Sequence, residues 1–261
     1  PLNDYKSSKL SSFTESKIRS IHAALTKDRG PYAANNAIRL VRNIFNYAVW
    51  AYADLRGTGN PVDCMEQLRL WNPETRRKRH ITSDDLPDWI KKAEALDGIQ
   101  RGAMLMMLFL GLRKEEVYCM KKTEIDAKGR CLVALDTKNG DDHYLPIGPY
   151  LWERLDPLLK LEGEWLFPSA SSKTGHIVDM RKAFDRLGIK ASAHDLRRTF
   201  VSSLNGLEPA PSAYTIKRLM NHRMKGSDVT AGYIQHEEKK LREVVTRLEA
   251  EMLKRPVILA L

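Results

Sequence analysis

This chain of 261 residues has few cysteines, and it lacks long apolar runs and an excess of acidic charge. Its three cysteines, Cys64, Cys119 and Cys131, lack metal-ligand spacing, and their odd number argues against a disulfide framework. The longest apolar run, 103–112, is too short to span a bilayer, and the N-terminus shows no signal-peptide pattern. The sequence therefore predicts a soluble protein of a reducing, intracellular compartment with no membrane partner.

Positive charge is what the chain has in excess, with 43 Lys and Arg against 33 Asp and Glu and a net charge of +10. Such a balance favours a polyanionic partner, because neutralising phosphates releases counterions. The acidic pairs Glu115-Glu116 and Asp141-Asp142 lack the convergent oxygen ligands that a Mg²⁺ site needs. We therefore expect no metal site, and a metal-dependent nuclease is disfavoured.

The length allows two domains, each with its own core. Residues 1–75 are predicted to form a helical domain. Thr14 can cap a helix with apolar residues at 18, 21, 24 and 25, and Pro31 can begin a second helix. Apolar residues at helical spacing extend this second helix through Tyr52 to Leu55, before glycines and a proline end it.

Residues 76–81 are predicted to link the two domains. The run Arg76-Arg77-Lys78-Arg79-His80 contains no apolar residue. Its four adjacent cations repel one another unless phosphate or solvent screens them. We favour a linker that follows DNA, with a solvated tether as the alternative.

Residues 82–261 are predicted to form the second domain. Thr82 and Asp85 resemble a capping box ahead of a helix that carries Leu86, Trp89, Ile90 and Ala93 inward. The following helix, 99–110, is apolar nearly all round and should be the buried centre.

Residues 123–147 change to a period of two, and turns at Lys128-Gly129 and Asn139-Gly140 predict a three-stranded antiparallel sheet. Helices are then expected near 149–160, 179–187, 194–205, 212–221 and 237–254. The predicted fold class is mainly α with a small antiparallel β-sheet (α+β).

The stretch from His194 to Tyr233 concentrates groups suited to phosphodiester chemistry. His194 and Arg197 are three apart and share a helix face, opposite Leu196, Phe200 and Val201. Arginine offers a fork for two phosphate oxygens, and histidine can move a proton. His222 adds a further hydrogen-bond donor. The phenol of a free tyrosine has a pKa of about 10, so Tyr233 needs nearby cations or a base to act as a nucleophile.

With these residues in place, the chain resembles the tyrosine recombinases, or phage-type integrases. Arg113 and Glu116 in Gly111-Leu112-Arg113-Lys114-Glu115-Glu116-Val117 fit the family's first arginine motif, and Lys138 fits its hairpin lysine. Every active-site position of that family is then filled, in order, by Arg113, Lys138, His194, Arg197, His222 and Tyr233. The chain departs from the family in Met220-Asn221-His222, where Leu-Gly-His is usual, and in a longer loop before Tyr233.

The resemblance implies a helical core-binding domain that clamps double-stranded DNA, followed by a catalytic domain. It implies cleavage and rejoining through a 3′-phosphotyrosyl bond without metal or ATP, with Glu116 holding Arg113 or a neighbour in place. The expected phosphate contacts are Lys17, Lys27, Arg39, Arg42, Asn46, Arg76, Arg77, Lys78, Arg79 and Arg198.

The resemblance also implies a homotetramer on paired DNA sites, a monomer free in solution and an accessory DNA-bending protein, in the cytoplasm and nucleoid of a prokaryotic host. The apolar tail 257–261 would dock on a neighbouring protomer or add a strand in cis. Two alternatives stay open, a type IB topoisomerase and a DNA-binding relative without catalysis.

Overall fold

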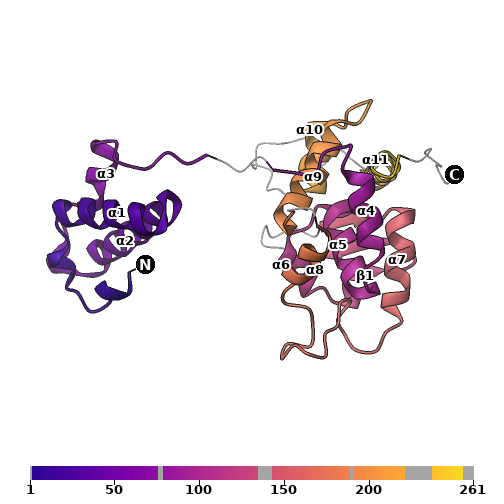
Figure 1. Ribbon diagram of the computed structural model, residues 1–261, viewed down its shortest axis with the longest axis horizontal. Helices are drawn as coiled ribbons and strands as arrows, with labels where there is room; N and C mark the ends of the chain where they lie inside the picture. The colour runs from indigo at the N-terminus through magenta and orange to yellow at the C-terminus, as the bar shows by residue number, and fades with distance from the viewer. Residues whose placement is uncertain (1, 76–78, 135–142, 189–190, 221–236, 255–261) are drawn as a thin grey trace. The chain divides into compact units, whose positions relative to one another are not determined.

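The computed structural model describes residues 2–75, 79–134, 143–188, 191–220 and 237–254. The chain forms two compact units that divide between Arg77 and Lys78. Helices dominate both units, and the second also holds a small sheet (Figure 1). The predicted fold class is therefore confirmed. Within the described ranges, no helix combines the length and the apolarity that crossing a membrane requires.

The first unit consists of helices α1 (Glu15–Arg29), α2 (Pro31–Ala51) and α3 (Cys64–Gln67). Thr14 caps α1 as predicted, because its side chain accepts a hydrogen bond from the backbone N–H of Lys17 at 3.3 Å. Gly30, with φ of 86°, turns the chain into α2. The core consists of Phe13, Ile18, Ile21, Ile38, Val41, Phe45, Val62, Cys64 and Met65.

Helix α2 is shorter than its apolar spacing predicted. It ends at Ala51, and Tyr52 has an extended backbone. Residues Ala53–Leu55 form a separate 3₁₀ turn, η3, closed by a hydrogen bond from the N–H of Leu55 to the carbonyl of Tyr52. The predicted continuation to Leu55 was therefore wrong, and the side chains of Ile44 and Tyr52 are exposed.

Short 3₁₀ turns complete the irregular parts of the chain: η1 (Asn3–Tyr5), η2 (Leu10–Ser12), η4 (Pro61–Asp63) and η5 (Lys122–Glu124). At the end of the first unit, a polar network fixes residues 72–75 against α2. Asn35 is fully buried and donates to the carbonyl of Asn72 and to the carboxylate of Glu74, at 3.0 and 2.7 Å. The chain therefore leaves this unit from a defined point.

Helix α5 (Gly98–Leu110) is the centre of the second unit, and its residues 102–110 are all buried, as predicted. The helices that pack against it include α4 (Leu86–Glu94), α7 (Pro149–Leu159) and α9 (Ala193–Asn205). Figure 1 shows α7 on one side of α5 and α9 on the other. Gly102 permits the close approach of α7, since a Cβ there would lie 2.7 Å from the side chain of Leu158.

The inward residues of α4 are buried as expected, but the helix begins after the predicted cap. Thr82 Oγ1 accepts a hydrogen bond from the N–H of Asp85 at 3.2 Å, within a turn that precedes Leu86. The remaining helices are α6 (Lys114–Tyr118), α8 (Arg181–Arg186), α10 (Ala213–Leu219) and α11 (Glu237–Met252).

The predicted three-stranded antiparallel sheet is present. Strands β1 (Ile125–Asp126), β2 (Cys131–Ala134) and β3 (His143–Pro146) lie in the order β1-β2-β3. Leu132 on β2 is paired with Ile125 on one side and Leu145 on the other, and all three are buried. Cys131, the neighbour of Leu132 on β2, is also buried, so burial in this sheet is not limited to alternate residues.

Glu249 of α11 forms hydrogen bonds with the start of α7. Its buried carboxylate accepts hydrogen bonds from the backbone N–H groups of Tyr150 and Leu151, both at 2.9 Å, at the N-terminus of α7. Burial raises the pKa of Glu249, and the two backbone donors oppose that rise. The start of α7 is therefore capped by a side chain from the last helix.

The described part of the expected linker packs on the second unit. Ile81 is buried, and its N–H donates to Thr199 Oγ1 at 2.9 Å. Arg79 binds the carboxylate of Asp195. The burial of one apolar residue directly after the basic run explains why residues 79–81 are part of this unit.

Candidate active site

Helix α9 carries two predicted site residues and presents them differently. Leu196 and Phe200 are fully buried and anchor the helix in the core. His194, in the first turn, is exposed, whereas Arg197 is only 8% exposed. Because residues three apart are neighbours on a helix, an exposed imidazole lies beside a buried guanidinium.

The guanidinium of Arg197 holds two distant backbone segments together. Its Nη1 donates to the carbonyl of Gly111, and its Nη2 donates to the carbonyl of Met220 at 2.9 Å. In the sequence, Gly111 is two residues before Arg113, and Met220 is two residues before His222. One buried side chain therefore fixes the backbone that leads to two other predicted site positions.

The turn at Gly111 directs the chain from α5 toward Arg113. Gly111 has a left-handed backbone with φ of 61°. A Cβ at this position would lie 2.3 Å from the ring of Phe200. Both facts require glycine, since other residues rarely adopt this backbone and none would fit against the ring.

Glu116 holds Arg113 through both its backbone and its side chain. Glu116 Oε2 accepts from the N–H of Arg113 at 2.7 Å, and Oε1 accepts from Nη1 at 2.8 Å. Arg113 is the cap residue of α6, and 51% of its side chain is exposed. The guanidinium is therefore oriented and still open to a ligand.

Arg113 and Arg197 are close enough for their charges to repel. Burial lowers the pKa of Arg197, the positive charge of Arg113 lowers it further, and Glu116 acts in the opposite direction. The two guanidinium groups therefore bring positive charge together beside the carboxylate of Glu116. An oxyanion with several oxygens, such as a phosphate, would complement this pair.

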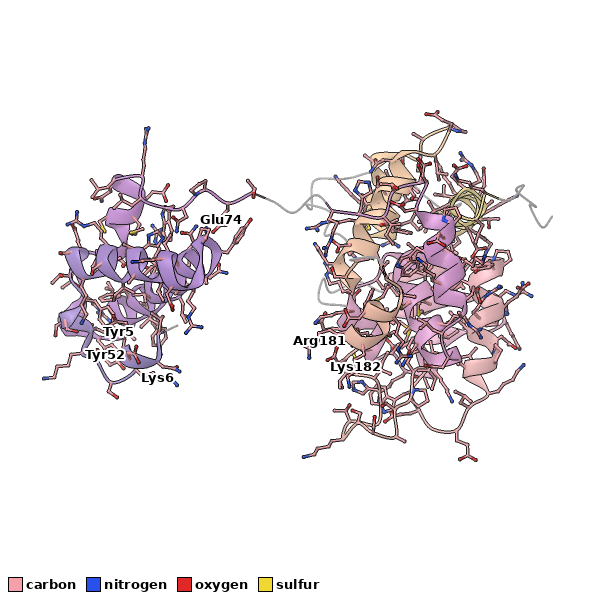
Figure 2. The ribbon with its side chains drawn as sticks, in the orientation of Figure 1. Tyr5, Lys6, Tyr52, Glu74, Arg181 and Lys182 are labelled. Atoms are coloured by element: carbon pink, nitrogen blue, oxygen red, sulfur yellow. The ribbon has the colours of Figure 1, made fainter. Side chains whose placement is uncertain are left out.

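A groove of about 740 Å³ opens beside His194. Lys114 and Tyr118 of α6 and Arg181 of α8 also line it. Burial raises the pKa of Tyr118 to about 12, so its phenol is neutral at physiological pH. Figure 2 shows Arg181 and Lys182 at the surface of α8, where Arg181 pairs with Asp179 at 2.7 Å. The exposed histidine is thus accessible to a large ligand.

Asp195, which the predicted site does not include, organises the first turn of α9. Its carboxylate accepts hydrogen bonds from the N–H and Oγ of Ser192, from Nε and Nη2 of Arg79 and from Nη1 of Arg198. Burial acts to raise the pKa of Asp195, but the hydrogen bonds from Arg79 and Ser192 outweigh it and lower that pKa. The Ser-x-x-Asp spacing at the helix start was the available signal.

The sequence model of the phage integrase family matches residues 79–240, more than half of the chain. The chain belongs to the phage integrase family. The matched stretch includes Arg113, His194 and Arg197 and begins at Arg79, the arginine that binds Asp195.

Two integrase relatives come from Sinorhizobium fredii (strain NBRC 101917 / NGR234). A protein named as integrase/recombinase y4qK is 31% identical over 157 residues, which cover 56% of this chain and 48% of that protein. A second, y4eF, is 29% identical over 157 residues and 59% of its length. The chain therefore spans about half the length of the curated relatives it matches.

Solved integrase structures have the same fold. The Tn1549 transposon integrase in complex with circular intermediate DNA matches with a TM-score of 0.62 at 17% identity, over 84% of this chain and 79% of that chain. A lambda integrase tetramer bound to a Holliday junction matches with a TM-score of 0.60 at 19% identity, over 90% of this chain and 66% of that chain.

In the first unit, three of the expected phosphate contacts have partners of their own. Arg39 pairs with Glu74 at 2.9 Å and Arg42 pairs with Asp63 at 3.0 Å (Figure 2 labels Glu74). Lys17 lies over aromatic rings and donates to a serine hydroxyl. All these pairs are partly exposed, and exposed ion pairs are weak enough to exchange for a phosphate.

Several of the expected residues lie outside the part of the chain that the structure describes. These are Lys138, His222 and Tyr233, together with Arg76, Arg77 and Lys78 of the basic run and the tail 257–261. Among the residues that the structure does describe, no three His, Cys, Asp or Glu side chains gather as metal ligands would.

Proposed function

We propose that this integrase chain is a site-specific DNA recombinase that cleaves and rejoins DNA through a tyrosine. The observation that carries the proposal is the buried guanidinium of Arg197 beside the exposed one of Arg113, which Glu116 holds in place. A phosphodiester has the charge and the paired oxygens that such a site would bind. Membership of the phage integrase family supports the same substrate.

The proposed reaction is a pair of transesterifications. The hydroxyl oxygen of Tyr233 attacks a DNA phosphorus, the bond from phosphorus to the 5′-oxygen breaks, and the 5′-hydroxyl leaves. A 5′-hydroxyl from a partner strand then attacks the 3′-phosphotyrosine and releases the tyrosine. Each step exchanges one phosphoester bond for another, so the scheme needs neither ATP nor a redox cofactor, and we propose no metal.

Each residue has one role in this scheme. Arg113 and Arg197 stabilise the negative charge of the five-coordinate phosphorus, and a preorganised donor of this kind contributes roughly 3–4 kcal/mol in other enzymes. His194 takes the tyrosine proton, Lys138 gives a proton to the leaving oxygen, and His222 donates to a phosphate oxygen. Glu116 keeps the Arg113 guanidinium in position.

The proposed working assembly is a homotetramer on two paired DNA sites, formed from monomers in solution, because exchange needs four cleavages. The fold shared with the lambda integrase tetramer on a Holliday junction supports this assembly. The first domain, 1–75, would clamp the DNA, with Lys17, Arg39 and Arg42 on its phosphates. We place the activity in the prokaryotic cytoplasm, at the nucleoid, with an accessory DNA-bending protein as a further partner.

Covalent trapping tests the proposal. A suicide DNA substrate with candidate sites would be incubated with the wild type, with Tyr233→Phe and with the matched control Tyr214→Phe, then run on a denaturing gel. We expect a protease-sensitive adduct in the wild type and in Tyr214→Phe only.

Site-specific binding with no adduct would instead indicate a DNA-binding relative. Adduct formation together with relaxation of supercoils by monomers, and without joining of two duplexes, would indicate a type IB topoisomerase. A recombinase predicts joined products from two duplexes.

A further inference from the structure

The carboxylate of Asp195 joins two arginines that are far apart in the sequence. Its Oδ2 accepts from Nε and Nη2 of Arg79 at 2.9 and 2.6 Å, and its Oδ1 accepts from Nη1 of Arg198 at 3.0 Å. A guanidinium has five N–H donors in a planar fork. Each arginine therefore keeps donors that Asp195 does not use.

The cluster has its negative charge inside and its positive charge outside. The side chain of Asp195 is 3% exposed, whereas those of Arg79 and Arg198 are 48% and 28% exposed. The carboxylate also accepts hydrogen bonds from the N–H and Oγ of Ser192, at 2.9 and 2.8 Å. A ligand that approaches from solvent therefore meets guanidinium donors and no exposed oxygen of Asp195.

This cluster adjoins the candidate active site. Arg198 is four residues after His194 on α9 and so shares its face. The Arg79 segment is held on the same helix by the hydrogen bond from Ile81 to Thr199. The two arginines are thus fixed to the helix that carries His194 and Arg197.

We propose that Arg79 and Arg198 together form a second phosphate-binding site, and that Asp195 is its positioning residue. The ligand is a DNA backbone phosphate that neighbours the one bound at Arg113 and Arg197, so the inference rests on the proposed function. Asp195 holds both forks with donors facing outward, and a phosphate can bind without displacing the carboxylate. A purely structural ion pair would instead hold residues 79–81 and make no contact with DNA.

The salt dependence of DNA binding tests the site. The full chain would be titrated with a short duplex of arbitrary sequence at several salt concentrations, as wild type, Arg79→Gln and Arg198→Gln. The slope of log affinity against log salt should shrink by about 0.9 for each lost phosphate contact. The matched control is Arg154→Gln, because Arg154 binds Glu94 at 2.8 Å with 20% exposure, and its slope should be that of the wild type.

A second pair of variants tests the positioning role. Asp195→Asn and Glu94→Gln each remove one negative charge that is paired with an arginine. Coulomb attraction alone predicts tighter DNA binding in both. We expect Asp195→Asn to bind the duplex several-fold more weakly, and Glu94→Gln to bind no more weakly than the wild type.

Wild-type slopes in both Arg79→Gln and Arg198→Gln would overturn the site, and these two variants remain informative if Asp195→Asn does not fold. Tightening in Asp195→Asn equal to that in Glu94→Gln would overturn the positioning role. Reduced slopes without any wild-type covalent adduct would reject the recombinase and keep the phosphate site. A wild-type covalent adduct together with unchanged slopes in both arginine variants would support the recombinase and reject the second phosphate site.

Discussion

The side chain of Arg197 donates to the main-chain carbonyl of Gly111, 86 residues earlier in the chain. This bond ties the first turns of α9 to the turn that leads to Arg113. The guanidinium of Arg197 therefore stabilises the fold through its hydrogen bonds to Gly111 and Met220. In the proposed site, its positive charge adds to that of the neighbouring Arg113.

Arg197→Lys should impair both stability and cleavage. A lysine ammonium is a compact donor and cannot span the two carbonyls that the guanidinium reaches. We expect the free energy of unfolding to fall by about 2–4 kcal/mol, and adduct formation to slow by about 10²–10³-fold. Urea denaturation and timed covalent trapping would measure these effects.

Arg154→Lys is the control for that prediction, because Arg154 also donates to a main-chain carbonyl, that of Tyr150, at 3.0 Å. It should lose some stability and keep the wild-type rate of adduct formation. An Arg197→Lys variant that is less stable but equally fast would show that Arg197 is a structural residue alone.

Gly111→Ala should be far more harmful than the same change at another left-handed glycine. Gly163 has φ of 88° and open space at its Cβ position, so Gly163→Ala carries backbone strain alone. We expect about 1 kcal/mol of destabilisation there and about 2–4 kcal/mol at Gly111, where the methyl group also meets Phe200. Thermal unfolding would measure both variants. Equal losses would contradict the proposed contact, and partial recovery in Gly111→Ala with Phe200→Leu would support it.

The stabilising effect of Asp195 should disappear in acid. Its pKa is lowered in the folded chain, so its contribution is present above the unfolded pKa of about 4 and is lost as the pH falls through the folded pKa. Wild type and Asp195→Asn should differ in unfolding free energy by about 1–3 kcal/mol at neutral pH. Denaturation at a series of decreasing pH values should show this difference shrinking as the pH falls through the lowered pKa of Asp195. A difference in unfolding free energy that grows in acid would mean that folding raises the pKa of Asp195 instead of lowering it.

Glu116→Gln should affect the reaction more than the fold. The Arg113–Glu116 pair is partly exposed, so its loss should change stability by less than about 1 kcal/mol. A neutral amide orients Arg113 less firmly, and we expect adduct formation to slow by about tenfold, or roughly 1.4 kcal/mol of barrier. Glu115→Gln is the control, since Glu115 pairs only with Lys114 among the ion pairs of the described chain. Equal rates in the two variants would remove Glu116 from the site.

The spacing of apolar residues predicted most helices and the sheet, because an element that buries one face has apolar residues at regular intervals in its sequence. It failed at the end of α2, where Tyr52 and Leu55 continue the spacing although the chain has already tightened into η3. It also gave no sign that Ile81, a single apolar residue after a basic run, is buried on α9. Short segments held by one side chain carry too little pattern for such a prediction.

The predicted site rests on residue types and order, so it could include Arg113, His194 and Arg197 before their surroundings were known. The partners of Arg197 could not be predicted, because main-chain carbonyls exist at every position and leave no mark in the sequence. Asp195 was overlooked for a different reason. A carboxylate next to arginines is usually an ordinary surface pair, and only its burial makes it distinctive.

The two anchors at Met220 and Glu249 bear on the proposed role of Tyr233. Arg197 fixes the chain just before residues 221–236, and Glu249 fixes the helix that follows them. In the sequence, the proposed nucleophile therefore stands between two anchored points of the unit that carries Arg113 and Arg197.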